Sequence, residues 1–433
     1  MRLRSINNRG LNSFIMQVTK TVCGEYLTCY IANGKAYYTG WNGYTVPSIK
    51  ELPITNAVDG HGGQYSCILM DSSGKPYIVR LNQDKCDTVP VNFTGASKVF
   101  ALYDAYFAIK AGKVYAFGKD YLKINGGKDI VNPILLNGSA NIVKLDGGSS
   151  TSFGDFQLSG IDSEGKVWRW INKTPTQVTF PGNIARNIAH VGPNCFVVET
   201  ATDLFAWGFR PNYVGLPWNQ TTPASIKKQY TDRGAIFPLK QLIGNYNTLH
   251  VIDSKDDMYG QGDNLDGQVG AGPVYDWKTN PKKLTPYNAP WDMTMYQSVI
   301  QIPGKWAEIF TSNSITFHLF ALDKVGNLFS WGRNKALNLG NGITLPAFGT
   351  NAYDKMPNAL DMPGPSYVSP LTQSWSVLKF DPANPPKQTP IPAPVIVEPA
   401  PSKKVIGTIS WAGLGLVTFF DDYTWSEGDG KVN

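Results

Sequence analysis

The chain lacks the patterns that mark several large classes of protein. It contains no run of eighteen apolar residues, so no helix is expected to span a membrane. Charged residues make up only 17% of the 433 residues, and the net charge is only +6. A charge this small on a chain this long forms no basic surface by itself, so nucleic acid is not an expected partner. Hydrophobic residues reach 42%, which excludes wholesale disorder.

Metal-binding and disulfide patterns are also missing. The chain has five cysteines, an odd number, at positions Cys23, Cys29, Cys67, Cys86 and Cys195. None of them forms a Cys-x-x-Cys pair, so neither a disulfide framework nor a zinc site is expected. None of the four histidines stands in a His-x-x-x-His pattern. We therefore expect no metal and no cofactor, and we interpret the cysteines as small buried hydrophobic residues.

The N-terminus gives no sign of export. Residues 1–9 carry positive charge, but no apolar segment of about 7–15 residues follows them, as a secretory signal would require. We expect the protein to be made in a cytoplasm without a signal peptide.

One short pattern recurs along the chain: a turn residue, an aromatic-rich strand and, in most copies, a closing glycine. Seven copies lie at residues 34–40, 74–79, 112–118, 165–170, 203–208, 257–262 and 326–332. A second strand-like stretch precedes most copies, as at residues 26–31 and 65–70, with Gly, Asn or Asp in the turn between them. Two β-rich runs joined by such a turn predict a β-hairpin.

The spacing of the copies predicts how the hairpins assemble. Successive copies begin 38 to 69 residues apart. A single hairpin is only marginally stable, so seven similar ones must pack on each other. Units of about 40–50 residues that each contain several strands are typical of β-propeller blades. We predict an all-β, seven-bladed β-propeller in which the longer units carry loop insertions.

A glycine-rich segment extends two of the copies. Residues 262–272, Gly-Asp-Asn-Leu-Asp-Gly-Gln-Val-Gly-Ala-Gly, resemble the signature of the RCC1-like repeat (regulator of chromosome condensation). Residues 332–342 form a looser copy, and the other units keep only the strand and the turn. The resemblance extends over about residues 17–350 and implies a seven-bladed propeller. Its glycines suit tight turns in which other residues would be strained.

Beyond the seventh copy the composition changes. Residues 382–401 contain eight prolines, a density that favours an extended polyproline II conformation. We divide the chain into a propeller over residues 1–380, a Pro-rich linker over residues 381–402 and a small C-terminal β module over residues 403–433. The last module is too small to hold a core alone, so we expect it to dock on a neighbouring subunit. Because residues 343–380 do not show a complete blade, residues 1–20 are a candidate strand for closing the ring.

Aromatic residues are concentrated in two insertions. Trp168, Trp207 and Trp331 belong to the repeated strand, and we assign them to the core between blades. The candidate binding residues lie in the insertions: Tyr275, Trp277, Tyr287, Trp291, Tyr296, Trp306, Tyr213 and Trp218. Loops on a rigid scaffold often carry binding, and interfaces concentrate Trp and Tyr. Two interpretations stay open: these rings bind a partner, or they pin long loops onto the propeller.

No motif for catalysis is present. Residues 160–167 nearly match a phosphate-binding P-loop, but Val167 replaces the required hydroxyl residue, and the segment occupies the hairpin position of the repeat. Asp253, Asp256, Asp257, Asp263 and Asp266 lie within fourteen residues, but their spacing does not fit a calcium-binding EF-hand loop. We expect turn-forming acids there and no enzyme, although a propeller can assemble an active site from several blades.

These features favour a non-enzymatic structural or binding protein that presents aromatic loops for macromolecular contacts. The leading hypothesis is a component of a large particle such as a bacteriophage tail, associated with the virion and attached to a host surface or a neighbouring subunit. Its partners would be other proteins of the assembly, and surface glycans are a second class of ligand that aromatic rims would suit.

Three alternatives stay open. The chain is similar in architecture to propeller-type β-lactamase inhibitory proteins, which implies an inhibitor of an enzyme. The RCC1-like resemblance implies nucleotide exchange on a small GTPase. The remaining alternative is an enzyme with carboxylates that converge at the central channel.

Overall fold

The computed structural model describes the repeat region almost continuously and the rest of the chain in part. The described residues are 18–40, 50–82, 85–138, 140–150, 155–192, 195–263, 268–270, 296–302, 304–312, 316–324, 326, 328–332, 343–345, 358–359, 362–367, 378–379, 405–411, 415–420 and 425–426. The chain separates into two compact units, Met1–Lys387 and Gln388–Asn433.

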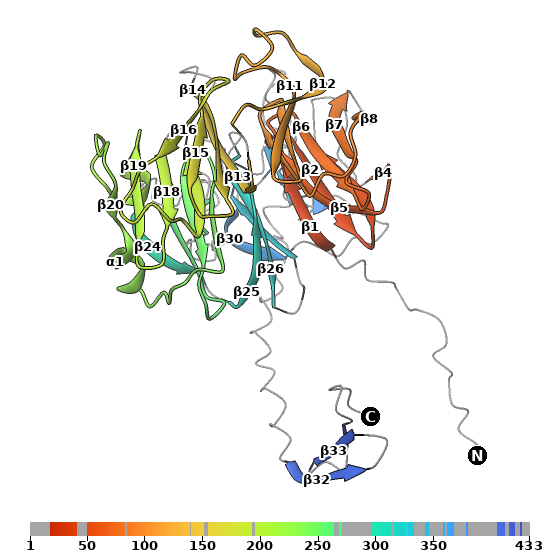
Figure 1. Ribbon diagram of the computed structural model, residues 1–433, viewed down its shortest axis with the longest axis vertical. Coiled ribbons are helices and arrows are strands. Elements are labelled where there is room, and N and C mark those ends of the chain that lie inside the picture. Colours follow the sequence, from red (N-terminus) through yellow and green to blue (C-terminus); the bar gives the residue numbers. More distant parts are fainter. Residues whose placement is uncertain are drawn as a thin grey trace, which may run out of the picture. The chain divides into compact units, whose positions relative to one another are not determined.

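The first unit is a seven-bladed β-propeller. In the part of the chain that the structure describes, seven four-stranded antiparallel sheets are arranged as blades in a ring (Figure 1). The first three blades contain β1 (Val18–Cys23), β2 (Leu27–Ala32), β3 (Lys35–Gly40) and β4 (Lys50–Thr55); β5 (Ala57–Gly62), β6 (Ser66–Asp71), β7 (Pro76–Asn82) and β8 (Lys85–Pro90); and β9 (Lys98–Leu102), β10 (Ala105–Lys110), β11 (Lys113–Gly118) and β12 (Ile130–Leu135). The predicted fold is confirmed.

The other four blades follow the same order. They contain β13 (Ile142–Ser150), β14 (Asp155–Asp162), β15 (Val167–Trp170) and β16 (Pro175–Val178); β17 (Asn187–Val191), β18 (Cys195–Glu199), β19 (Leu204–Gly208) and β20 (Ala224–Ser225); β21 (Gln241–Gly244), β22 (Thr248–Ile252), β23 (Met258–Gly262) and β24 (Tyr296–Ile302); and β25 (Trp306–Phe310), β26 (His318–Asp323), β27 (Leu328–Gly332) and β30 (Met362–Tyr367). The fifth blade also carries a 3₁₀ turn, η1 (Pro211–Val214), and a short helix, α1 (Lys227–Thr231).

Two small sheets complete the described strands. One contains β28 (Ile343–Leu345), β29 (Asn358–Ala359) and β31 (Leu378–Lys379). The second unit contains β32 (Val405–Trp411), β33 (Gly415–Phe420) and β34 (Trp425–Ser426), which pair as a three-stranded sheet. The predicted linker at residues 381–402 lies outside the described residues.

Local sequence explains the hairpin between the second and third strands of each blade. In the first blade, Asn33 and Gly34 both have positive φ, 52° and 72°, which a two-residue turn with the twist of the strands requires. In the second, fourth and sixth blades an aspartate takes over the turn. The carboxylate of Asp162, for example, accepts the N–H groups of Glu164 and Lys166 at 2.9 Å each. The P-loop-like segment is therefore a structural turn, as its position predicted.

The core lies between the blades. The second strands are buried along their whole length in β2, β18 and β22, because a neighbouring blade covers each face of the sheet. Trp207 and Trp331 are buried as predicted, and Trp168 is half-buried with its Nε1–H donating to the Asp162 carboxylate at 2.9 Å. Blades come so close that a Cβ on Gly62 would lie 1.7 Å from the carbonyl oxygen of Cys23 in the preceding blade, so only glycine fits there.

The ring closes by side-chain packing between the first and last blades. One buried cluster joins residues of both blades: Val18, Cys23, Tyr30, Ala32, Tyr37, Phe310, Phe320, Leu322 and Leu328. Within the described residues, β1 starts at Val18 and pairs with β2, while β30 (Met362–Tyr367) pairs with β27 as the fourth strand of the last blade. Residues 18–20 therefore belong to the first blade and do not complete the last one.

Candidate functional site

The repeated strand order gives the propeller two distinct faces. In every blade the first strand turns into the second, and the third strand leads to the fourth, at the same end of the sheet. We call this end the loop face. The hairpins between second and third strands lie at the opposite end, which we call the turn face. The connections between third and fourth strands therefore all begin and end at the loop face, whichever blade they belong to.

Aromatic rings from neighbouring blades pair on the loop face. Tyr26 of the first blade and Tyr65 of the second stack with 5.2 Å between ring centroids and 5° between ring planes. Two hydrogen bonds fix the turns that carry them: Glu25 N–H donates to the carbonyl of Gln64 at 3.1 Å, and Gln64 Nε2 donates to the Glu25 carboxylate at 2.9 Å. Because these hydrogen bonds join the two turns, the rings are held in a defined geometry. Tyr65 is 53% exposed.

The same arrangement continues around the loop face. Tyr121, 43% exposed, lies 5.0 Å from Phe156 of the next blade and 6.3 Å from Tyr103, centroid to centroid. Tyr246 and Phe317, from the turns of the sixth and seventh blades, pair edge to face at 5.4 Å. Such pairs add about 0.5–1.5 kcal/mol beyond the area that they bury, so they also stabilise the contacts between blades.

The insertion of the fifth blade adds a separate aromatic group. Phe209 and Trp218 lie edge to face at 5.8 Å, and the Arg210 guanidinium lies 5.3 Å and 5.2 Å from the centroids of their rings. Trp218 is 53% exposed. Cation–π contacts to both rings position the arginine, and Trp and Arg are residues that concentrate binding energy in interfaces.

The structure describes four of the eight predicted binding residues and places them in different environments. Trp218 is exposed and Tyr213 is half-buried in η1, both in the loop-face insertion of the fifth blade. Tyr296 begins β24, where the chain re-enters the sixth blade from the loop face. Tyr275, Trp277, Tyr287 and Trp291 lie outside the described residues.

Trp306 is a core residue. It is 3% exposed and packs against Phe329 at 5.3 Å and Trp331 at 6.2 Å. It begins the first strand of the seventh blade, at the register position that Val18 and Ala57 occupy in the first two blades. We therefore correct its assignment from the binding surface to the core between blades.

Sequence reasoning missed Tyr26, Tyr65 and Tyr121. The first two lie at the start of strand-like stretches, and each follows a short glycine-containing turn, Gly24-Glu25 and Gly63-Gln64. The recurrence of Gly-x-Tyr at the start of the second strand was a detectable signal for an aromatic turn. Tyr121 lies shortly after the third strand of its blade, which places it in a loop-face insertion.

A second candidate site lies in the central channel. A cavity of about 400 Å³ is lined by first strands from several blades, with Lys20, Asp59, His61, Lys98, Lys144 and Asp146 among its residues. Burial lowers the pKa of His61 to about 4, so the ring is neutral at physiological pH. The Ala101 N–H donates to His61 Nδ1 at 3.2 Å, and the single ring proton therefore lies on Nε2.

Among the described residues, Asp59 and Asp146 line the channel and are held by a basic or polar group, and burial raises the pKa of the nearby Glu308. Asp59 forms an ion pair with Lys20 at 2.5 Å. Asp146 Oδ1 lies 2.8 Å from His190 Nδ1, and Ser159 Oγ lies 3.3 Å from His190 Nε2. This sequence of groups resembles a nucleophilic triad in connectivity, but both Ser159 and His190 are fully buried, so no substrate reaches the hydroxyl. The network stabilises the contact between the fourth and fifth blades.

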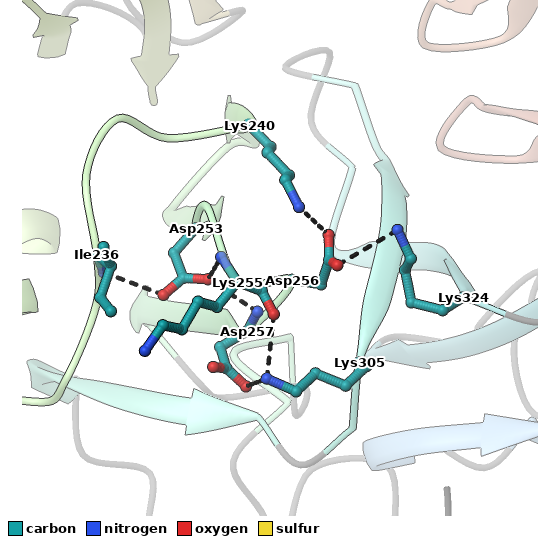
Figure 2. Close-up of polar contacts among 8 residues, drawn as sticks. All are labelled: Ile236, Lys240, Asp253, Lys255, Asp256, Asp257, Lys305 and Lys324. Atoms are coloured by element: carbon teal, nitrogen blue, oxygen red, sulfur yellow. Dashed lines mark hydrogen bonds and ion pairs between the residues drawn. The ribbon is translucent and has the colours of Figure 1, made fainter. Parts of the chain in front are cut away.

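The acidic turn of the sixth blade is also structural (Figure 2). Asp253 accepts the N–H groups of Ile236, Lys255 and Asp257 through its carboxylate, at 2.8 to 3.0 Å. Lys240 and Lys324 bind the Asp256 carboxylate, and although burial alone would raise the pKa of Asp256, these hydrogen bonds lower it.

The third acid of that turn is paired as well, since Lys305 of the next blade forms an ion pair with Asp257 at 2.8 Å. The described residues contain no group of three or more His, Cys, Asp or Glu side chains that would hold a metal ion. The turn therefore fastens the sixth blade to the seventh, in agreement with the structural role expected from its spacing.

Comparisons with known proteins identify the fold. No family model matches the chain, and no curated protein matches its sequence. Among solved structures, Prp20p from Saccharomyces cerevisiae, described with its binding to Gsp1p and histones, is 16% identical, with a TM-score of 0.53 over 82% of this chain and 88% of that one. Yeast RCC1 (Prp20) bound to Kap60 is 15% identical, with a TM-score of 0.55 over 85% and 91%.

A human protein with a similar fold is also among the matches. Human WBSCR16 is 14% identical, with a TM-score of 0.53 over 69% of this chain and 85% of that one. RCC1-like β-propellers are thus among the structures that this chain resembles, and at these identities the likeness concerns the fold alone. No helix in the described part of the chain is long and apolar enough to cross a membrane.

Proposed function

We propose that the protein is a non-enzymatic binding protein whose loop face contacts another protein. The observation that carries this proposal is the set of aromatic rings on that one face, of which Tyr65, Tyr121 and Trp218 are the most exposed. Large aromatic side chains held in place lose little conformational entropy on binding, so they are effective anchors in an interface. Asp59, Asp146 and Asp253 are held by basic or backbone groups, which favours binding over catalysis.

The fold of similar proteins supports a protein partner. Prp20p is described with its binding to Gsp1p and histones, and yeast RCC1 with Kap60. We propose that this chain, too, uses its propeller as a platform for binding proteins and that it belongs to the RCC1-like group. The second candidate function, a regulator of a small GTPase or of an enzyme, is favoured by the same comparison.

Alanine variants of the loop face test the proposal. The triple variant Tyr65→Ala, Tyr121→Ala and Trp218→Ala removes the three exposed rings without touching the buried core. A matched control, Ile184→Ala with Ile236→Ala, removes exposed apolar side chains at the turn face. We expect the triple variant to lose the partner captured by the tagged wild-type chain while the control retains it. Equal capture by both variants would remove the loop face as the contact surface.

The same capture experiment separates the particle hypothesis from the regulator hypothesis. A chain that ends at residue 381 lacks the C-terminal β module and serves as the second bait. If capsid or tail proteins co-purify with the full chain alone, the protein is a virion component anchored by that module. If one soluble enzyme or GTPase co-purifies with both baits, the propeller is a regulator, and the virion-associated location is withdrawn.

A further inference from the structure

The seven first strands carry one equivalent position, and at five of these positions the residue lines the channel cavity. The position is defined by strand pairing. In five blades its residue pairs with the penultimate residue of the second strand, and in the fifth and sixth blades it pairs with the last residue of that strand. The seven residues are Lys20, Asp59, Lys98, Lys144, Asn187, Gln241 and Glu308, paired with Ile31, Met70, Ile109, Ile161, Glu199, Ile252 and Leu322. First strands of successive blades are neighbours around the ring, so these side chains form a polar ring in that order.

Most members of the polar ring are satisfied by their neighbours. Asp59 lies between two lysines, 2.5 Å from Lys20 and 3.9 Å from Lys98. Gln241 is tied to the seventh blade, because its amide group both donates to and accepts from the main chain of Ile309 at 2.7 Å. These bonds neutralise Lys20 and fix Gln241.

At one place in the polar ring, two neighbouring positions are both occupied by lysine. Lys98 and Lys144 occupy the equivalent position on adjacent strands, β9 and β13, which are in contact. Lys144 Nζ donates to the neutral amide oxygen of Asn187 at 3.2 Å. Among the described residues, neither lysine has a carboxylate to itself. Lys98 shares Asp59 with the closer Lys20 and lies near Glu308, and Asp146 and Glu199 act on Lys144 without forming an ion pair with it. A positive charge from each of the two lysines would attract an anion that enters the space beside their strands.

The space beside these two lysines is open. Both lysines line the channel cavity of about 400 Å³, together with His61, Thr311 and Ser312. A second hollow of about 520 Å³ shares Lys98 and Val143 with it and continues over Ser97, Asn141 and Ser163 towards the turn face. This volume is in the range of sites that hold small molecules, about 300–1,000 Å³. The space beside Lys98 and Lys144 is therefore open and large enough for a small ligand.

We propose that the channel binds a small anionic molecule whose carboxylate or phosphate group lies between Lys98 and Lys144. Charged N–H groups form short, strong hydrogen bonds to such oxygens, and two lysines from different blades would hold the group from both sides. The site is independent of the loop face, because it uses side chains of the first strands inside the channel.

Binding of two simple anions to the full-length protein tests the proposal. Inorganic phosphate and succinate are titrated by calorimetry at low ionic strength, into the wild-type protein and into Lys98→Met and Lys144→Met. Lys113→Met is the matched control, since it removes the same charge from an exposed position of the third blade. We expect saturable binding of at least one anion, weakened about tenfold or more by each channel variant and unchanged by the control.

A charge-retaining variant keeps the test decisive. Lys98→Arg should bind within a few-fold of wild type, whereas loss of Lys98 by methionine should not. Because the Lys98 side chain is 63% exposed, its replacement leaves the fold intact even if Lys144→Met does not fold. The absence of saturable binding to either anion, or equal affinity in Lys98→Met and Lys113→Met, would overturn the proposal.

Discussion

The contact that closes the ring gives the most informative stability prediction. Tyr30 of the first blade and Phe320 of the seventh are both fully buried, and their rings meet edge to face at 5.9 Å. They come from strands that are nearly three hundred residues apart in the chain, β2 and β26. If the ring closes by packing, as we argue, these two rings must be energetically coupled in the folded protein.

A double-mutant cycle measures that coupling. Tyr30→Leu and Phe320→Leu each keep most of the volume but remove a ring, and each should lower the free energy of unfolding by about 1–3 kcal/mol. The double variant should lose less than the sum of the two, by about 0.5–1.5 kcal/mol, because the edge-to-face contact is lost only once. Urea unfolding followed by tryptophan fluorescence gives the four free energies.

The control cycle uses a ring that is buried elsewhere. Phe107 belongs to the core cluster of the third blade and shares no cluster with Tyr30. Tyr30→Leu and Phe107→Leu should therefore add within about 0.3–0.5 kcal/mol. If the Tyr30 and Phe320 variants were equally additive, the first and last blades would not be packed as described, and the closure argument would be refuted.

Three further predictions follow from buried groups. Tyr30→Phe should raise the free energy of unfolding by about 0.5–2 kcal/mol in urea melts, because the buried Tyr30 hydroxyl has no hydrogen-bond partner among the described residues; a loss of stability would contradict this. Gly62→Ala should lower the free energy of unfolding by more than about 3 kcal/mol, and with it the thermal midpoint, since the added Cβ would lie 1.7 Å from the Cys23 carbonyl oxygen. A thermal midpoint near that of the wild type would show that the blades are further apart. Burial lowers the pKa of His250 to about 4, so the unfolded state binds a proton that the folded state does not, and stability should fall as the pH drops from about 6.5 through about 4. The loss of stability due to His250 should reach about 2 kcal/mol by pH 5. His250→Gln should reduce the slope of unfolding free energy against pH by about half, because the pKa of His61 is lowered to the same value and His61 contributes the other half. An unchanged slope would contradict the assignment.

Much of the fold was predictable because short segments of the sequence determine it locally. A turn such as Asn33-Gly34, followed by an aromatic strand, specifies a hairpin without reference to the rest of the chain. Seven such hairpins at similar spacing then predict the number of blades, since each blade must pack against its neighbours. The buried positions of Trp207 and Trp331 follow from the same repeat.

The sites were less predictable because they arise from register between blades. Lys98 and Lys144 are neighbours only because β9 and β13 start their blades in the same register, and no local pattern joins two residues so far apart. Trp306 was misplaced because it lies in a long stretch without a repeat copy, where the first strand of the seventh blade was not recognised. Tyr26 and Tyr65 become a pair only when the turns of adjacent blades meet.

Site-specific photocrosslinking tests the central claim, that the loop face contacts a protein partner, most directly. A photoreactive phenylalanine analogue is placed at Tyr65 or Trp218 on the loop face and, as the matched position on the turn face, at Ile184, all of which are more than half exposed. After irradiation with the source extract, mass spectrometry identifies the linked proteins. The account predicts one and the same partner linked from Tyr65 and Trp218 and absent from Ile184; linkage from Ile184 alone would contradict it.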